Sequence, residues 1–164
     1  MADRPTSKQQ GEFHDPLENY EPKTYDDVLE QALCDETVTA IQAKPFATVT
    51  PDTPVHEAVK KLAALHHACL LVEDNGKLVG VFSDRDALDK VALEYEQVKD
   101  RPVREVMTDQ PVYVYKTDSS AAALSVMAVS GYRHVPVVDL EENVVGIISP
   151  QRVTSYLQKY FESE

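Results

Sequence analysis

Two stretches of this sequence repeat at an interval of about 65 residues, and this duplication limits the possible folds most strongly. Residues 38–50 align with residues 103–115, and each stretch reads as a short helical turn, a polar or proline break and a β-rich strand. Residues 71–86 align with residues 136–152 as strand, acidic turn, strand and a glycine-containing corner. The second copy carries one extra residue, which we assign to its hairpin loop because loops tolerate insertions.

Each copy predicts the element order β-α-β-β-α. A strand at 47–50 or 112–115 precedes a helix that begins near Pro54 or Ser119, and a hairpin and a final helix follow. Asp, Thr, Ser and Pro at these starts are typical first-turn and capping residues. The strands CLLV and VPVVD lack polar alternation, so we expect both of their faces to be covered. We predict a mixed α/β (α+β) fold of two β-α-β-β-α repeats packed about a pseudo-twofold axis.

The sequence predicts four segments. Residues 1–24 form an acidic N-terminal arm that we expect to be disordered, because it is polar and rich in proline. Residues 25–37 place apolar side chains near helical spacing and predict a short helix, which either covers the edge of the core or binds a partner. The first repeat then spans residues 38–99, and the second repeat, with a C-terminal helix, spans residues 100–164.

The composition limits the partners. Lys and Arg number 16 against 28 Asp and Glu, a net charge of −12, which disfavours binding to nucleic acid. Cys34 and Cys69 have no metal-ligand or disulfide spacing, so we expect reduced thiols. No apolar run approaches the roughly 20 residues of a membrane helix, and the N-terminus lacks an apolar signal core. We therefore expect a cytoplasmic protein with no membrane partner.

Three motifs stand out: residues 131–139 (GYRHVPVVD), residues 80–86 (GVFSDRD) and residues 103–108 (VREVMT). They resemble, in that order, a strand, the strand-to-helix corner and the lead-in of the tandem cystathionine-β-synthase (CBS) domain pair. The likeness covers residues 38–157, with these motifs in order and repeated. The resemblance implies a module that senses adenine nucleotides.

The corner of the first repeat contains Gly80, Ser83 and Asp86. We expect the glycine to permit a tight turn, and the serine to begin a helix whose free amides and hydroxyl suit phosphate or ribose. Asp86 lies one turn further along and can accept hydrogen bonds from both ribose hydroxyls. The alternative is purely local, because Ser83 and Asp86 are also common capping residues.

The family resemblance implies that each cleft is built from both repeats. For the Asp86 cleft, the implied contacts are the apolar walls Val81 and Ala68, a base contact from Tyr132, phosphate contacts from Arg133 and Lys116, and His134 in either role. The alternative is that Tyr132 is a partly buried packing residue and His134 a histidine at the strand edge.

The second cleft departs from the motif. It keeps Ser149, but Pro150 follows, and Arg152 stands where the carboxylate belongs. Arginine cannot accept a hydrogen bond, so this cleft either binds nothing or binds a ligand through its phosphates. The alternative is that Arg152 is an ordinary solvated helix residue with no role in binding. The facing wall would come from His67, Ala68 and Cys69. We predict no metal site, because His66 and His67 are adjacent rather than at ligand spacing.

We therefore predict a stand-alone regulatory module that binds AMP, ADP or ATP and passes its occupancy to an unknown regulated protein. No obligatory cofactor is expected, and we predict that the chain is not an enzyme, because no nucleophile, base and orienting partner can be assembled. The alternative is a scaffold with degenerate clefts. Helices 54–65 and 119–130 are apolar around much of their circumference, so we also predict a homodimer.

Overall fold

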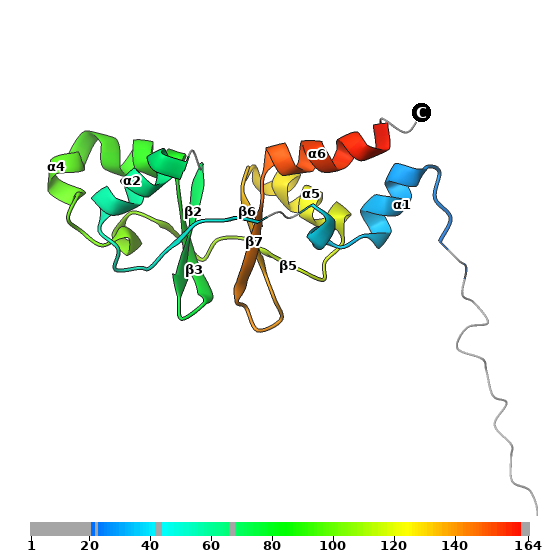
Figure 1. Ribbon diagram of the computed structural model, residues 1–164, viewed down its shortest axis with the longest axis horizontal. Helices are drawn as coiled ribbons and strands as arrows, with labels where there is room; N and C mark the ends of the chain where they lie inside the picture. Colours follow the sequence, from blue (N-terminus) through cyan, green and yellow to red (C-terminus); the bar gives the residue numbers. More distant parts are fainter. Residues whose placement is uncertain (1–20, 22, 42–43, 66–67, 162–164) are drawn as a thin grey trace, which may run out of the picture.

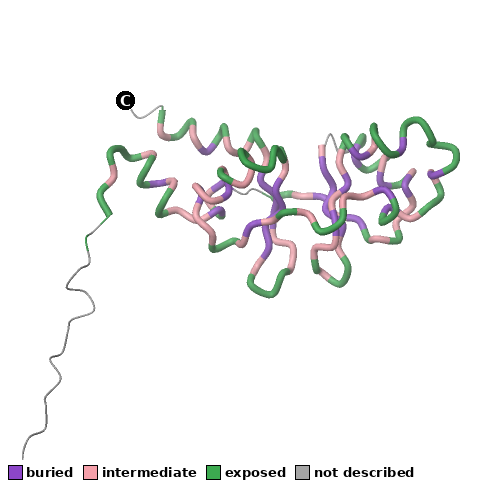
Figure 2. Tube along the Cα trace, turned by 180° about the vertical axis from the view of Figure 1, so that it is seen from behind, coloured by how far each residue is buried: buried purple, intermediate pink, exposed green. Residues whose placement is uncertain are grey.

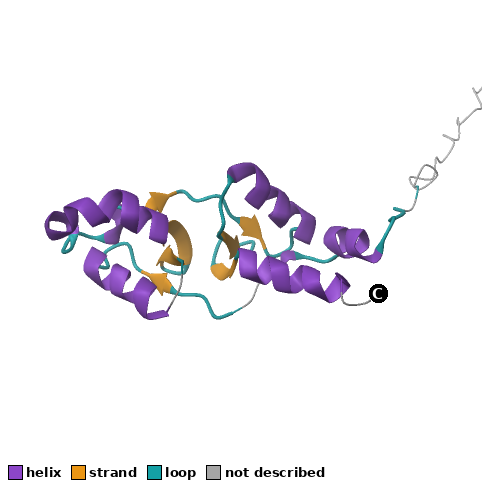
Figure 3. Cartoon of the chain, turned by 90° about the horizontal axis from the view of Figure 1, so that it is seen from above, coloured by secondary structure: helices purple, strands orange, loops and turns teal. Residues whose placement is uncertain are grey.

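The computed structural model describes residue 21 and residues 23–41, 44–65 and 68–161. Most of the expected N-terminal arm lies outside the described residues. The described chain forms two halves that lie side by side along the long axis of the molecule (Figure 1). Seen from above, the strands of the two halves face each other in the middle and the helices lie outside (Figure 3).

The first half is built on a sheet with the strand order β1-β2-β3-β4. β1 is parallel to β2, and β2 forms an antiparallel hairpin with β3 whose turn contains Asn75 and Gly76 at positive φ. After β3 the chain is helical, as the sequence predicts, but it passes from α to π to 3₁₀ geometry. In chain order the elements are β1 (Thr48–Val49), α2 (Val55–Leu65), β2 (Cys69–Asp74), β3 (Lys77–Ser83), α3 (Asp84–Asp86), the π turn η2 (Ala87–Val91), the 3₁₀ turn η3 (Ala92–Glu94) and α4 (Tyr95–Val98).

The second half repeats this plan on a sheet with the order β5-β6-β7. β5 is parallel to β6, and β6 is antiparallel to β7. Its final helix is regular and begins at a proline, which suits a first helical turn because that position needs no amide donor. The elements are β5 (Val114–Tyr115), α5 (Ser120–Ser130), β6 (Val135–Val138), β7 (Val144–Ile148) and α6 (Pro150–Phe161).

The two halves exchange their lead-in segments. α1 (Val28–Asp35) and the 3₁₀ turn η1 (Val38–Ala40) precede the first repeat, yet they pack on α5 and α6 of the second half. In return, η4 (Val103–Glu105) packs in the first half, and β4 (Thr108–Asp109) joins the edge of β3. The sequence interpretation did not include β4, because its pairing partner lies far away in the chain. The predicted segments 1–24, 25–37, 38–99 and 100–164 follow the order of the chain. As boundaries of domains they stay a prediction.

Buried residues concentrate on the strands (Figure 2). The predicted burial of both strand faces is confirmed, because Leu70, Leu71 and Val72 of β2 are fully buried and β6 is buried along its whole length. Each half has its own core, and a smaller cluster around Leu71 and Ile147 joins the two sheets. This packing confirms the predicted arrangement of two repeats about a pseudo-twofold axis, and it leaves a cleft on either side of the joint.

Candidate functional site

The first cleft lies where the end of β3 meets the loop between α5 and β6. Its volume is about 100 Å³, and its walls come from the first corner, from β4 and from the second repeat. The sequence-predicted residues Val81, Ser83, Asp86, Tyr132, Arg133 and His134 are brought together here. The complete lining is Cys69, Val81, Ser83, Asp84, Arg85, Asp86, Thr108, Gly131, Tyr132, Arg133 and His134.

Ser83 and Asp86 form a capping box at the start of α3. Ser83 has extended backbone angles, and its Oγ accepts a hydrogen bond from the Asp86 amide at 3.3 Å. The Asp86 Oδ2 accepts in return from the Ser83 amide at 2.9 Å and from the Ser83 hydroxyl at 2.6 Å. These hydrogen bonds satisfy free amides at the helix start. Ser83 and Asp86 therefore have the local capping role that the sequence analysis gave as the alternative to ligand contact.

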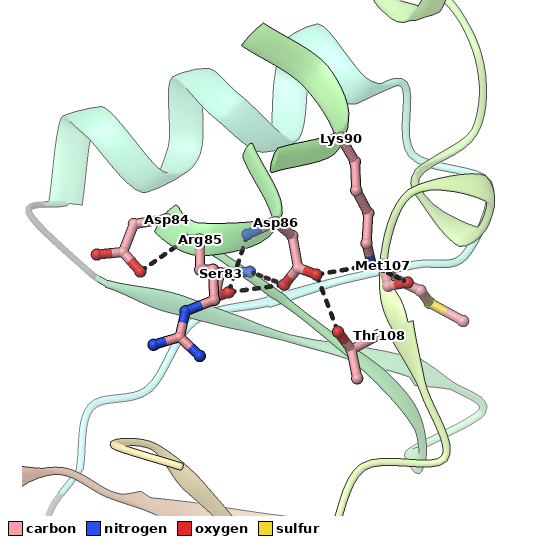
Figure 4. Close-up of polar contacts among 7 residues, drawn as sticks. All are labelled: Ser83, Asp84, Arg85, Asp86, Lys90, Met107 and Thr108. Carbon is pink, nitrogen blue, oxygen red and sulfur yellow. Dashed lines mark hydrogen bonds and ion pairs between the residues drawn. The ribbon is translucent and has the colours of Figure 1, made fainter. Parts of the chain in front are cut away.

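The other oxygen of Asp86 reaches beyond its own repeat. Its Oδ1 accepts from Lys90 Nζ at 2.8 Å and from Thr108 Oγ1 at 2.9 Å, and Lys90 Nζ also donates to the Met107 carbonyl at 3.0 Å (Figure 4). Both carboxylate oxygens therefore accept two hydrogen bonds each. A ribose hydroxyl would have to replace one of these donors, and Thr108, on the exchanged β4, lies at the cleft wall.

The environment of Asp86 keeps its carboxyl ionised. The residue is only 6% exposed, and burial alone would raise its pKa. The hydrogen bonds from Lys90, Ser83 and Thr108 outweigh burial and hold the pKa of Asp86 below its usual value. Asp86 thus stays an ionised hydrogen-bond acceptor at the base of the first cleft, and Lys90 balances its charge.

The rim of the first cleft carries the opposite charge. Arg133 Nη2 lies 3.9 Å from Asp84 Oδ2, so a weak ion pair connects the second repeat to the first across this site. Both side chains are more than half exposed, and such a pair stabilises the protein little. Arg85 lines the same cleft. An incoming phosphate could therefore take Arg133 from Asp84 at small cost.

Gly80 is needed for a reason that the sequence interpretation did not give. The expected tight turn is wrong, because Gly80 lies within β3, paired with Val72 and Asp109. A Cβ at this position would overlap the Met107 side chain from the exchanged lead-in. The glycine therefore permits the close approach of the second repeat's lead-in to β3.

Two predicted contacts lie away from the first cleft. Ala68 lines the second cleft instead, because the chain enters β2 on that side. Lys116 lines neither of the two clefts formed by the described residues. Its side chain is exposed, and its amide donates to the Val138 carbonyl at the end of β5. The sequence analysis did not predict Asp84 and Arg85 as cleft residues, although both lie inside the SDRD motif. Thr108 could not be predicted, because no local sequence pattern places it at the cleft.

The second cleft is larger, with a volume of about 390 Å³. It contains Ser149 and Arg152, as predicted, and the Arg152 guanidinium is partly buried and hydrogen-bonded. Nη1 donates to the Ile147 carbonyl at 2.6 Å, and Nη2 donates to the Pro45 carbonyl at 2.8 Å. Burial lowers the pKa of Arg152 from its usual value. The lining residues are Pro45, Phe46, Ala47, Ala68, Cys69, His134, Ile147, Ser149, Pro150, Gln151 and Arg152.

Cys69 lines both clefts and is buried. Burial, with smaller contributions from Asp86 and Asp84, raises the pKa of the Cys69 thiol to about 12. A neutral thiol is a poor nucleophile, and Cys69 packs in the buried cluster that joins the two sheets. His66 and His67 lie outside the described residues.

The described part of the chain contains neither a metal-binding cluster nor a membrane-spanning helix. These residues contain no group of three or more His, Cys, Asp or Glu side chains placed to hold a metal ion. None of the helices within the same ranges is long and apolar enough to cross a membrane.

Comparisons with known proteins agree on one family. The family model described as CBS domain matches residues 38–93 and again residues 103–159. The CBS domain-containing protein CBSCBSPB5 of Arabidopsis thaliana is 34% identical over 106 residues, which cover 64% of this chain and 19% of that protein. This chain thus corresponds to a small part of that longer relative.

Two solved structures show the same fold. The CBS domain protein NE2398 superposes with a TM-score of 0.63 and 32% identity, covering 70% of this chain and 88% of that one. CBSX2, solved in complex with AMP, superposes with a TM-score of 0.66 and 26% identity, covering 75% of this chain and 96% of that one.

Proposed function

The chain belongs to the CBS domain family as a tandem pair of repeats, and on this premise we propose that it is a regulatory module that binds an adenosine nucleotide in its first cleft. The observation that carries the proposal is the joint placement of an ionised, buried Asp86 and a cationic rim with Arg133 in one cleft. AMP, ADP and ATP are the candidate ligands. The structure of CBSX2 with AMP supports this ligand class.

The charges of the first cleft favour one orientation of the nucleotide. The ribose would lie at the corner, where Asp86 accepts hydrogen bonds from hydroxyls. The phosphate would face the rim, where Arg133 and Arg85 offer guanidinium groups that match phosphate geometry. Val81 and Tyr132 would contact the adenine ring.

Binding must widen this cleft. Its volume of about 100 Å³ is below the ~300 Å³ at which small-molecule sites begin. The exposed ion pair between Arg133 and Asp84 lies across the site and costs at most about 1 kcal/mol to break. A phosphate that replaces Asp84 as the partner of Arg133 would recover that cost.

Occupancy can reach the rest of the chain through the exchanged lead-in. A ribose hydroxyl that competes for Asp86 would weaken its bond to Thr108, and Thr108 holds β4 on the first half. The position of residues 103–109 would then depend on the ligand. We propose that an unidentified cytoplasmic protein reads this change. The prediction that the chain is not an enzyme stays a prediction.

Calorimetry tests the proposal directly. Titration with AMP, ADP, ATP and S-adenosylmethionine should show binding of at least one nucleotide. Arg133→Ala should weaken it about tenfold, the low end for a charge-assisted hydrogen bond because Arg133 is exposed. Lys116→Ala removes the same charge outside both clefts and should leave the affinity unchanged. Absence of binding for every ligand would favour the scaffold alternative, for which the arginine at the corner of the second cleft is the supporting observation.

We also propose that a second copy of the chain covers part of the helical surface. α2 buries Val55, Ala58 and Leu62 within its own half, but Val129 of α5 is 90% exposed and Leu93 of η3 is 96% exposed. Light scattering should give twice the chain mass of 18.3 kDa. A mass near 18.3 kDa, with and without AMP, would contradict the dimer.

A further inference from the structure

The C-terminal end of α1 carries an unfavourable charge pattern. Its last residue, Asp35, and its cap, Glu36, are both acidic, and no basic residue lies in the last turn. The carbonyl groups at the end of a helix carry partial negative charge, so cations are favoured there and carboxylates are not. Neither carboxylate forms an ion pair with a described residue. A bound cation would therefore stabilise this end of α1.

The same end of α1 borders a cavity between α1 and α6. The C-terminal part of α6 lies beside α1 (Figures 1 and 3), and the cavity between them has a volume of about 240 Å³. The α1 residues that line it follow helical spacing and share one face of the helix. The lining residues are Val28, Gln31, Ala32, Asp35, Glu36 and Tyr160.

Both carboxylates at this cavity keep one oxygen for a further donor. Asp35 Oδ1 accepts a hydrogen bond from the Tyr25 hydroxyl at 2.5 Å, and Glu36 Oε1 accepts one from the Tyr160 hydroxyl at 3.1 Å. Among the described residues, none donates to Asp35 Oδ2 or Glu36 Oε2. The two tyrosines thus orient a pair of acceptors whose remaining oxygens are available to a ligand.

A buried hydroxyl next to this cavity is also unsatisfied. Tyr156 is 2% exposed, its ring centroid lies 5.4 Å from that of Tyr160, and its Oη has no hydrogen-bond partner in the described part of the chain. Burial raises the pKa of Tyr156, and Tyr160 and Glu36 raise it further because both lie near its hydroxyl. A buried hydroxyl without a partner is costly, so the inner wall of the cavity is incomplete without a further polar group.

The chemistry of the cavity fits a guanidinium group. A guanidinium offers five donors in one plane and stays charged, so a single group can bind oxygens of both Asp35 and Glu36. Its methylene stem would pack on Ala32 and on Val28, which is 70% exposed. An ammonium group is a compact point charge and would bind two separate carboxylates less completely.

We propose that the cavity between α1 and α6 binds an arginine side chain of a partner protein. Exposed apolar surface at Val28 and at Phe161, which follows Tyr160 and is 68% exposed, offers contacts to the residues that flank the arginine. The net charge of −12 also favours the approach of a basic partner. The sequence analysis left open whether the 25–37 helix covers the core or binds a partner; in this proposal it does both. The proposal does not depend on nucleotide binding in the first cleft.

A nuclear magnetic resonance titration of the full chain tests the ligand. The probe is a blocked five-residue peptide with one arginine among alanines, and it should shift the amide signals of residues 28–36 and Tyr160 in a saturable way. The same peptide with lysine should bind at least about threefold more weakly. Absence of shifts, or equal binding of the lysine peptide, would overturn the proposal. Agmatine, a free alkylguanidinium, should bind more weakly than the peptide; tighter binding would point to a small molecule instead of a partner protein.

Charge-removing variants locate the site. Glu36→Gln keeps an acceptor for Tyr160 but should weaken peptide binding about tenfold, and the more exposed Asp35→Asn about two- to fivefold. Glu30→Gln is the matched control, because it removes an exposed carboxylate of α1 that does not line the cavity, and its affinity should stay unchanged. Each variant removes one negative charge. Equal losses in all three would therefore show a general electrostatic attraction and refute the site.

Thermal unfolding without peptide tests whether the cavity is incomplete. Asp35→Asn and Glu36→Gln should each raise the melting temperature by about 1–4 °C, because each relieves unfavourable charge at the end of α1. Tyr156→Phe loses no hydrogen bond and should melt no lower than the wild type. A fall of more than about 2 °C in any of these variants would mean that the group is already satisfied within the chain, which would contradict the proposal.

Discussion

Replacing Asp86 with alanine should destabilise the protein by about 3 kcal/mol. The change removes the reciprocal cap with Ser83, worth about 1 kcal/mol. Thr108 loses its acceptor, for about another 1 kcal/mol. Lys90 is 42% exposed and keeps its bond to the Met107 carbonyl, so its lost ion pair adds only about 1 kcal/mol. For a chain of this size the melting temperature should fall by about 6–12 °C.

The loss should depend on pH, because only the ionised carboxylate can accept hydrogen bonds from Lys90, Ser83 and Thr108 at the same time. Burial would raise the pKa of Asp86, but hydrogen bonds from Lys90, Ser83 and Thr108 hold it below the usual value. A carboxyl with a lower pKa in the folded chain stabilises the fold above its unfolded pKa of about 3.9, and this contribution is lost as the pH falls through the folded-state pKa. The difference between wild type and Asp86→Ala should be full at pH 7 and shrink below about pH 4.

Urea unfolding followed by far-ultraviolet circular dichroism measures both effects, and it suits a chain without tryptophan. Asp89→Ala is the matched control, because it removes an exposed carboxylate from the same helical segment. It should change the free energy of unfolding by less than about 0.5 kcal/mol. The reasoning is refuted if Asp86→Ala behaves like this control at pH 7, or if its deficit is undiminished at pH 3.5.

Calorimetry then separates the two roles of Asp86. Asp86→Ala should lower the affinity for AMP roughly ten- to a hundredfold, as expected for lost charge-assisted hydrogen bonds. Thr108→Val removes a structural donor but leaves the carboxylate, so it should retain AMP binding or strengthen it. Equal losses in both variants would mean that Asp86 affects AMP only through the fold.

Three further predictions concern single contacts. Asp84→Asn should release Arg133 and tighten AMP binding about two- to fivefold by calorimetry, with a smaller gain at high salt. An unchanged affinity would argue against competition between Asp84 and the phosphate for Arg133. Gly80→Ala should cost about 1–3 kcal/mol in urea unfolding, and adding Met107→Ala should recover much of it; additive losses would exclude the steric explanation. Cys69 should resist iodoacetamide at pH 8 in the native protein and react after unfolding, because burial raises its pKa to about 12, so fast native labelling would contradict its burial.

The sequence predicted the features that depend on neighbours along the chain. The duplicated pattern of apolar and turn residues specified the order of strands and helices, because strand alternation and helix spacing are local signals. The corner was predictable for the same reason, since Ser83 and Asp86 interact across three residues whatever surrounds them. The placement of Arg133 and His134 at the first cleft followed from the family resemblance rather than from spacing.

The tertiary structure alone decided how the two copies share their parts. The exchange of lead-ins brings Thr108 to Asp86 and Met107 against Gly80, and these contacts depend on pairing between distant segments that no local pattern encodes. The same exchange turns Arg152 towards the Pro45 carbonyl. A side chain's residue type limits what it can donate or accept, but only the packing of distant segments determines which partner it meets.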